Sequence, residues 1–171
     1  MSFIGIIANK KCFENIRKKI AEESKEETIN LIPINLRSIE NIKNIKFETI
    51  VIEDSIEKLK KQEEILAKLL ENTQYLIINT DKNKEMETLR KKGDKITYGL
   101  NQKATVTVSS ISDTDILIYW QKGLKNKEGN DIEIEERRIK KKQKESNLKT
   151  YEILIIYTLF QLYQKDIMEE I

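Results

Sequence analysis

The stretch Thr49–Asn79 decides the fold class; it reads TIVIEDSIEKLKKQEEILAKLLENTQYLIIN. Its two ends, Thr49–Ile52 and Tyr75–Asn79, are short apolar runs rich in isoleucine, which is typical of strands buried on both faces. Between them, Ser55–Glu71 places its Ile and Leu residues mostly on one helical face, behind a serine that can cap the helix. A strand, a helix and a second strand predict a parallel βαβ unit with a right-handed crossover.

Outward from this stretch, the first half of the chain continues to alternate strands and helices. An edge position is indicated for the second strand, because Pro33 has no N–H to donate to a neighbouring strand. Gly93 is expected to end the last helix. The further elements expected are a strand at Phe3–Ala8, a helix at Cys12–Glu23, a strand at Leu31–Leu36 and a helix at Lys84–Lys92.

The second half changes character, with alternating apolar and polar residues that favour antiparallel strands. We expect strands at Lys95–Tyr98, Ala104–Ser110 and Asp115–Gln121, a loop at Gly123–Asn130, a hairpin partner at Asp131–Ile139 and an apolar helix at Tyr151–Ile167. That helix is expected to be central, or else to form a dimer contact. The sequence therefore predicts one α/β domain over residues 1–171. We expect a three-layer fold with a mostly parallel sheet flanked by helices, and antiparallel strands from the second half.

Composition excludes several function classes. The 171 residues include no histidine and one cysteine, so the commonest general base, an intrachain disulfide and a multi-cysteine zinc site are all excluded. With 31 basic and 29 acidic residues, the charge is nearly balanced, which gives solubility rather than strong attraction to nucleic acid or membrane. The sequence shows no signal peptide and no apolar run near the roughly 20 residues that span a bilayer, so we expect a cytoplasmic protein.

Two short motifs within Tyr75–Val106 carry a family resemblance. A strand ends in Asn79-Thr80-Asp81, and a second one carries Thr97-Tyr98-Gly99 before the region that begins near Ala104. In this order and spacing the stretch resembles the end of the central ATPase domain of the Mur ligases, which build peptidoglycan precursors with ATP. The following order of strands, loop and apolar helix is similar as well. The sequence departs from the family pattern at Lys82, where the family has a second aspartate.

The resemblance implies a nucleotide site after the first strand, but the residues there have changed. A phosphate cradle needs glycines, a lysine and a hydroxyl for magnesium. The chain has Ala8 and Lys11 near the glycine positions and Cys12-Phe13 near the lysine and hydroxyl positions. The family's histidine-containing metal stretch has no counterpart near Glu53. The resemblance therefore implies a reduced relative that does not ligate, and it disfavours ATP and Mg²⁺ as cofactors.

Four residues remain candidates for ligand binding: Lys10 and Lys11 near a helix N-terminus, and Asn79 and Asp81 at the carboxyl end of a strand, where open α/β sheets bind ligands. The preferred interpretation is nevertheless that the two lysines are solvated and that Asn79 and Asp81 cap the following helix. Glu53 and Asp54 could join Asp81 in a carboxylate cluster for a divalent ion, but capping of the Ser55 helix is the preferred interpretation. A nucleophilic Cys12 lacks a histidine to act as its base, so we predict no catalytic residue and no metal site.

A second candidate region is an interaction surface formed by Trp120 with Arg137, Arg138, Lys140, Lys141 and Lys142. The basic run could meet nucleic acid, yet no aromatic residue is interleaved in it, so a solvated loop over Arg137–Lys149 is preferred. Trp120 is interpreted either as hairpin packing or as an exposed contact.

We therefore expect a non-catalytic module that binds a protein partner, a second copy or an unidentified small ligand, in a cell-wall or sporulation context that the resemblance implies. The alternatives are a nucleotide- or anion-binding enzyme that uses Lys10, Lys11, Asn79 and Asp81, and a nucleic-acid binder that uses Arg137–Lys149.

Overall fold

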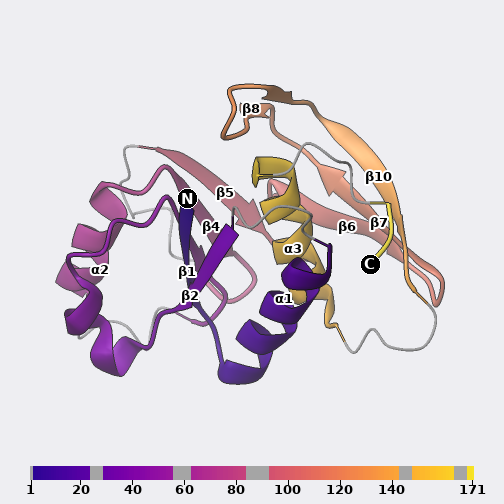
Figure 1. Cartoon of the computed structure of the whole chain (residues 1–171). Helices are drawn as coiled ribbons and strands as arrows, with labels where there is room; N and C mark the ends of the chain where they lie inside the picture. The colour runs from indigo at the N-terminus through magenta and orange to yellow at the C-terminus, as the bar shows by residue number, and fades with distance from the viewer. Residues whose placement is uncertain (1, 24–28, 56–62, 84–92, 143–147, 164–168) are drawn as a thin grey trace. The chain divides into compact units, whose positions relative to one another are not determined.

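The chain forms two compact units, Met1–Ile96 and Thr97–Ile171 (Figure 1). The structure, a computed structural model, describes residues 2–23, 29–55, 63–83, 93–142, 148–163 and 169–171. The expected α/β class is confirmed, because parallel strands with helices fill the first unit and antiparallel strands with a helix fill the second. A single domain over 1–171 stays a prediction.

The first unit is a parallel sheet with strand order β4-β3-β1-β2. Because β2 and β3 lie on opposite sides of β1, the strand order reverses between β1 and β3, which is where open α/β sheets form their ligand crevice. The elements of this unit are β1 (Ser2–Ile7), α1 (Lys10–Glu23), β2 (Ile29–Pro33), the 3-10 helix η1 (Leu36–Ile42), β3 (Thr49–Ile52), α2 (Glu63–Glu71) and β4 (Tyr75–Asn79), followed by β5 (Asp94–Tyr98) across the unit boundary.

Helices α1 and α2 lie on opposite sides of this sheet (Figure 1). Successive strand residues point to opposite faces, so the fully apolar strands feed two cores at once. One core joins β1, β3 and β4 to α2 and η1; its buried members are Ile7, Ile34, Ile39, Phe47, Ile50, Ile52, Leu66, Leu69, Leu70, Leu76 and Ile78. Helix α1 buries Cys12, Phe13, Ile16 and Ile20, which recur at helical spacing.

The second unit contains an antiparallel sheet in which β7 lies between β6 and β10. A small hairpin of β8 and β9 is separate from that sheet. Gly129 has a φ of 84° at the tip of this hairpin, a conformation that glycine adopts without a steric penalty. The elements are β6 (Val106–Ile111), β7 (Asp115–Trp120), β8 (Leu124–Lys125), β9 (Asp131–Ile132), β10 (Glu135–Lys140) and α3 (Thr150–Tyr163).

Helix α3 is buried along most of its length, which confirms its interpretation as a core helix. The ring of Tyr157 lies 6.4 Å from that of Trp120 on β7. Trp120 has no exposed surface, and its indole N–H donates to the carbonyl of Lys122. The exposed-contact hypothesis for Trp120 is therefore wrong, and the hairpin-packing alternative is right.

Most expected element bounds agree with the structure to within two residues, and Thr49–Ile52 and Tyr75–Asn79 agree fully. The strand expected at Leu31–Leu36 is β2 at Ile29–Pro33, and Leu36 instead begins η1. Three more expectations are corrected. Helix α1 begins at Lys10 rather than Cys12, because Asn9 caps it. The Gly123–Asn130 loop contains β8, and the single strand expected at Asp131–Ile139 divides into β9 and β10, because β9 pairs with β8 while β10 pairs with β7.

The basic run Arg137–Lys149 was expected as a loop, but its first four residues, Arg137–Lys140, belong to strand β10. The strand continues this far because Ile139 is fully buried in the sheet. The expected helix Lys84–Lys92, the first turns of the Ser55 helix and the end of the Tyr151–Ile167 helix lie outside the described residues.

Candidate functional site

The carboxyl ends of β1, β3 and β4 carry the polar residues of the first unit's sheet. At the end of β1, Asn9 caps α1: its side-chain Oδ1 accepts the Cys12 N–H at 3.0 Å, and its carbonyl accepts the Phe13 N–H at 3.0 Å. Asparagine is among the best N-cap residues because its oxygen satisfies an N–H that the helix leaves open. One of the N–H groups that the start of α1 would leave open is thus taken by the Asn9 side chain.

The chain after β3 folds across the end of β1. The N–H groups of Glu53 and Asp54 both donate to the carbonyl of Ile7, at 2.9 and 3.2 Å. Backbone from β3 therefore takes up the carbonyl at the end of β1, at the reversal of strand order where a ligand crevice would form.

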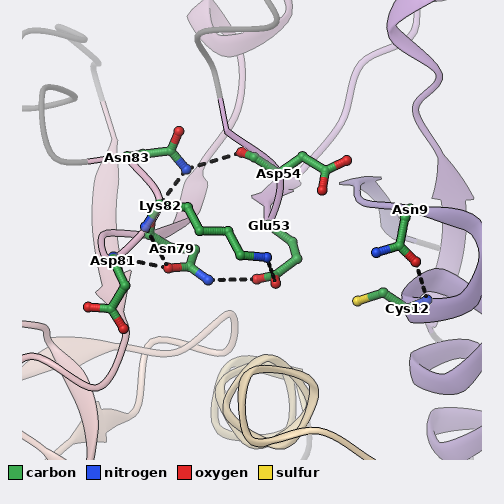
Figure 2. Close-up of polar contacts among 8 residues, drawn as sticks. All are labelled: Asn9, Cys12, Glu53, Asp54, Asn79, Asp81, Lys82 and Asn83. Carbon is green, nitrogen blue, oxygen red and sulfur yellow. Dashed lines mark hydrogen bonds and ion pairs between the residues drawn. The ribbon is translucent and has the colours of Figure 1, made fainter.

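A buried polar cluster then joins β3 to β4 (Figure 2). Asn79 is fully buried and donates from Nδ2 to Glu53 Oε2 at 2.9 Å, and Lys82 Nζ forms an ion pair with Glu53 Oε1. The Glu53 side chain is only 5% exposed, against 37% for Lys82. A buried carboxylate needs paired charge and hydrogen bonds, and this cluster supplies both, one to each oxygen.

Asn79 also shapes the turn that places Lys82. Its Oδ1 accepts the N–H groups of Asp81 and Lys82, at 3.0 and 3.2 Å. Asn83 donates from Nδ2 to the carbonyls of Asn79 and Asp54, at 3.0 and 3.1 Å, which ties the β4 turn to the loop after β3. The Asn79-Thr80-Asp81 motif thus builds a turn that aims Lys82 at Glu53.

The four candidate ligand residues do not form one group. Asn79 lies inside the cluster, whereas Lys10 and Lys11 are exposed on the first turn of α1. Figure 2 shows the Asn9–Cys12 pair apart from the Glu53 cluster. Asp81 contributes its backbone N–H to the turn, and its carboxylate points away from Glu53 in Figure 2.

The alternative that Glu53, Asp54 and Asp81 form a carboxylate cluster for a divalent ion is wrong. Both Glu53 oxygens accept from nitrogen donors on Asn79 and Lys82. Among the residues described, no group of three or more acidic or cysteine side chains lies together as metal ligands would. The residues present do not fit the Mg²⁺ of the Mur ligases, because the ammonium of Lys82 already places a positive charge against Glu53, where a cation would have to bind.

Three members of this site were missed in the sequence: Asn9, Asn83 and Lys82, whose partner Glu53 lies 29 residues earlier in the chain. Asn9 stands directly before a helical pattern, and that position is a signal for an N-cap. Asn83 donates to the carbonyl of Asn79 at the end of β4 and to that of Asp54 after β3, and no local pattern predicts such a role.

The second candidate region divides across the two faces of β10, because successive strand residues point to opposite sides. Arg137 is 20% exposed and forms an ion pair with Glu135 at 2.5 Å. Arg138, Lys140 and Lys142 are exposed, and Arg138 lies 3.4 Å from Asp115. The expected continuous basic surface is thereby reduced, with Arg137 drawn onto the face of α3.

Glu135 also receives the hydroxyl of Tyr157, at 3.3 Å. Burial, reinforced by the negative charge of Glu135, raises the pKa of Tyr157 to about 12. Tyr157 therefore stays protonated and acts as a hydrogen-bond donor at neutral pH, which makes it a structural group rather than a base.

Comparison with known proteins adds no relative: no family model matches the sequence, and no curated protein matches it. In the part of the chain that the structure describes, helices are too short or too polar to cross a bilayer.

Proposed function

We propose that this protein is a non-catalytic relative of the Mur-ligase central domain that serves as a cytoplasmic binding module. The supporting resemblance lies in Asn79-Thr80-Asp81 and Thr97-Tyr98-Gly99, which stand at the carboxyl ends of β4 and β5. A cell-wall or sporulation context follows from that resemblance and belongs to the proposal.

The observation that carries the proposal is that polar groups at the carboxyl ends of β1, β3 and β4 bind other groups of the chain. The Lys82 ammonium forms an ion pair with Glu53, and the side-chain oxygen of Asn9 accepts the Cys12 N–H in the first turn of α1. Phosphate binding at a helix start needs backbone N–H groups that converge on the anion, and the Cys12 N–H points to Asn9 instead. The cluster holds β3 and β4 together where a catalytic relative would hold nucleotide and metal.

The test is a titration of the full chain with ATP and Mg²⁺, paired with a phosphate-release assay. We expect no hydrolysis, and no binding in the micromolar range. Micromolar binding with hydrolysis would overturn the proposal in favour of an enzyme. In that case the double variant Lys10→Glu/Lys11→Glu would lose binding, since both lysines are exposed at the start of α1. Lys18→Glu/Lys103→Glu is the matched control, because it makes the same charge change at exposed lysines elsewhere.

A further inference from the structure

A short acidic segment of the chain lies along the outer edge of the basic strand β10 (Figure 1). The segment is Glu169–Ile171, and it runs parallel to Lys140–Lys142, with Lys140 opposite Glu170. Lys140 N–H donates to the Glu169 carbonyl at 2.9 Å, and Ile171 N–H donates to the Lys140 carbonyl at 2.8 Å. Lys142 N–H donates to the Ile171 carbonyl at 2.8 Å, which completes a parallel ladder.

The edge can accept a strand because its hydrogen-bonding groups alternate in direction. Lys141 N–H points the other way and donates to the Thr114 carbonyl at 2.7 Å. The Lys140 and Lys142 N–H groups are thus left on the outer side of the sheet, where an added strand would pair. Main-chain pairing of this kind provides affinity for an extended peptide, and side chains select its sequence.

The side chains of the segment show what sequence this edge selects. Ile171 has no exposed surface, and strand alternation places it on the face of Ile139, which is also fully buried. Glu170 pairs in register with Lys140 on the opposite face, the face of Arg138. Ile171 therefore serves as an aliphatic anchor at a buried position. Glu170, the acidic residue before it, lies on the face of the exposed cations Arg138 and Lys140.

We propose that the Lys140–Lys142 edge is a docking site for an acidic peptide strand with a Glu-Glu-Ile pattern, which Glu169–Ile171 occupies in cis. A partner carrying such a segment binds by displacing the chain's own copy. The inference rests on the proposed function as a binding module, and it names the class of partner.

The test measures binding of a labelled peptide, Asp166–Ile171 in sequence (DIMEEI), to the full chain by fluorescence anisotropy. In the Ile171→Ser variant the cis segment loses its anchor, so we expect the peptide to bind at least tenfold more tightly than to the wild type. The cis segment otherwise competes at a high effective concentration. The matched control Ile134→Ser removes an exposed isoleucine and is expected to bind as the wild type does.

Two altered peptides test the chemistry of the edge. DIMEES is expected to lose binding to Ile171→Ser because it lacks the anchor. DIMEKI is expected to bind at least fivefold more weakly at low salt, with a smaller difference in 0.5 M salt, where charge attraction is screened. Equal binding of DIMEEI and DIMEES, or no gain in Ile171→Ser over the wild type, overturns the proposal.

Hydrogen exchange of the wild type decides the case even if Ile171→Ser fails to fold. Displacement requires that the segment opens without global unfolding, so the amides of Lys140, Lys142 and Ile171 should exchange faster than those of α3. Exchange of these amides only together with α3 overturns the proposal. The ATP experiment is independent: hydrolysis refutes the proposed function and leaves the peptide result intact, whereas failed peptide binding removes only the named partner.

Discussion

Replacement of Lys82 by methionine tests whether the Glu53–Lys82 pair holds β3 and β4 together. The substitution keeps the length and apolar stem of the side chain and removes the ammonium from a Glu53 side chain that is 5% exposed. Breaking a buried ion pair from one side costs about 3–5 kcal/mol, because a charge is left in the interior. Since Lys82 is 37% exposed, water screens part of the interaction, and we expect a loss of about 2 kcal/mol.

The assay is urea unfolding followed by circular dichroism. With a denaturant slope of about 2 kcal/mol per molar, the midpoint should fall by about 1 M. The control is Lys43→Met, which breaks an exposed pair with Glu40 at 3.0 Å and should change the stability by less than about 1 kcal/mol. The double-mutant cycle with Glu53→Gln should give a coupling energy of about 1–2 kcal/mol. A Lys82→Met loss no larger than that of Lys43→Met, or strictly additive effects in the cycle, would refute the reasoning.

Three further changes have defined outcomes. Asn9→Ala removes the oxygen that accepts the Cys12 N–H and should cost about 1 kcal/mol in urea unfolding, while Asn9→Asp, which keeps a capping oxygen, should restore most of it. Gly93→Ala places a Cβ 2.4 Å from the Gln74 carbonyl oxygen and should lower the free energy of unfolding by about 1–3 kcal/mol. In the control Gly123→Ala the Cβ meets nothing closer than 3.9 Å, so the loss should be less than about 1 kcal/mol. Equal effects would contradict the steric argument. The raised pKa of Tyr157 means that its protonated form stabilises the folded state. This contribution to the free energy of unfolding is fully present below pH 10 and is lost as the pH rises from 10 to about 12. The urea midpoint should therefore fall over that range in the wild type and fall less in Tyr157→Phe.

Much of the fold could be predicted from local pattern. Strands β3 and β4 show up as short apolar runs, and helix α2 shows up as apolar residues that recur every three or four positions. Both patterns depend only on residues that are near one another in the sequence. The division of Asp131–Ile139 into two strands could not be predicted in this way. Both strand halves have suitable residues, and the break arises because β9 and β10 pair with different partners.

The candidate site was predicted in part. Asn79 is the last residue of a buried strand, and this position alone marked it. Its role as the centre of a closed cluster was missed, because that role depends on Glu53, which lies 26 residues earlier in the chain. The two interpretations of Trp120 could be separated only by the fold, because its ring packs against Tyr157 of α3, which comes much later in the chain.

The amino-acid sequence by itself determined the alternation of strands and helices, and the lack of histidine excluded its common chemistries. The tertiary structure alone decided the long-range pairings: Lys82 forms an ion pair with Glu53 across 29 residues, and the backbone at Lys140 pairs with the backbone of Glu169–Ile171. The physical reason is that periodicity is a property of neighbouring residues, whereas the partner of a charged side chain is whatever the folded backbone brings within a few ångströms of it.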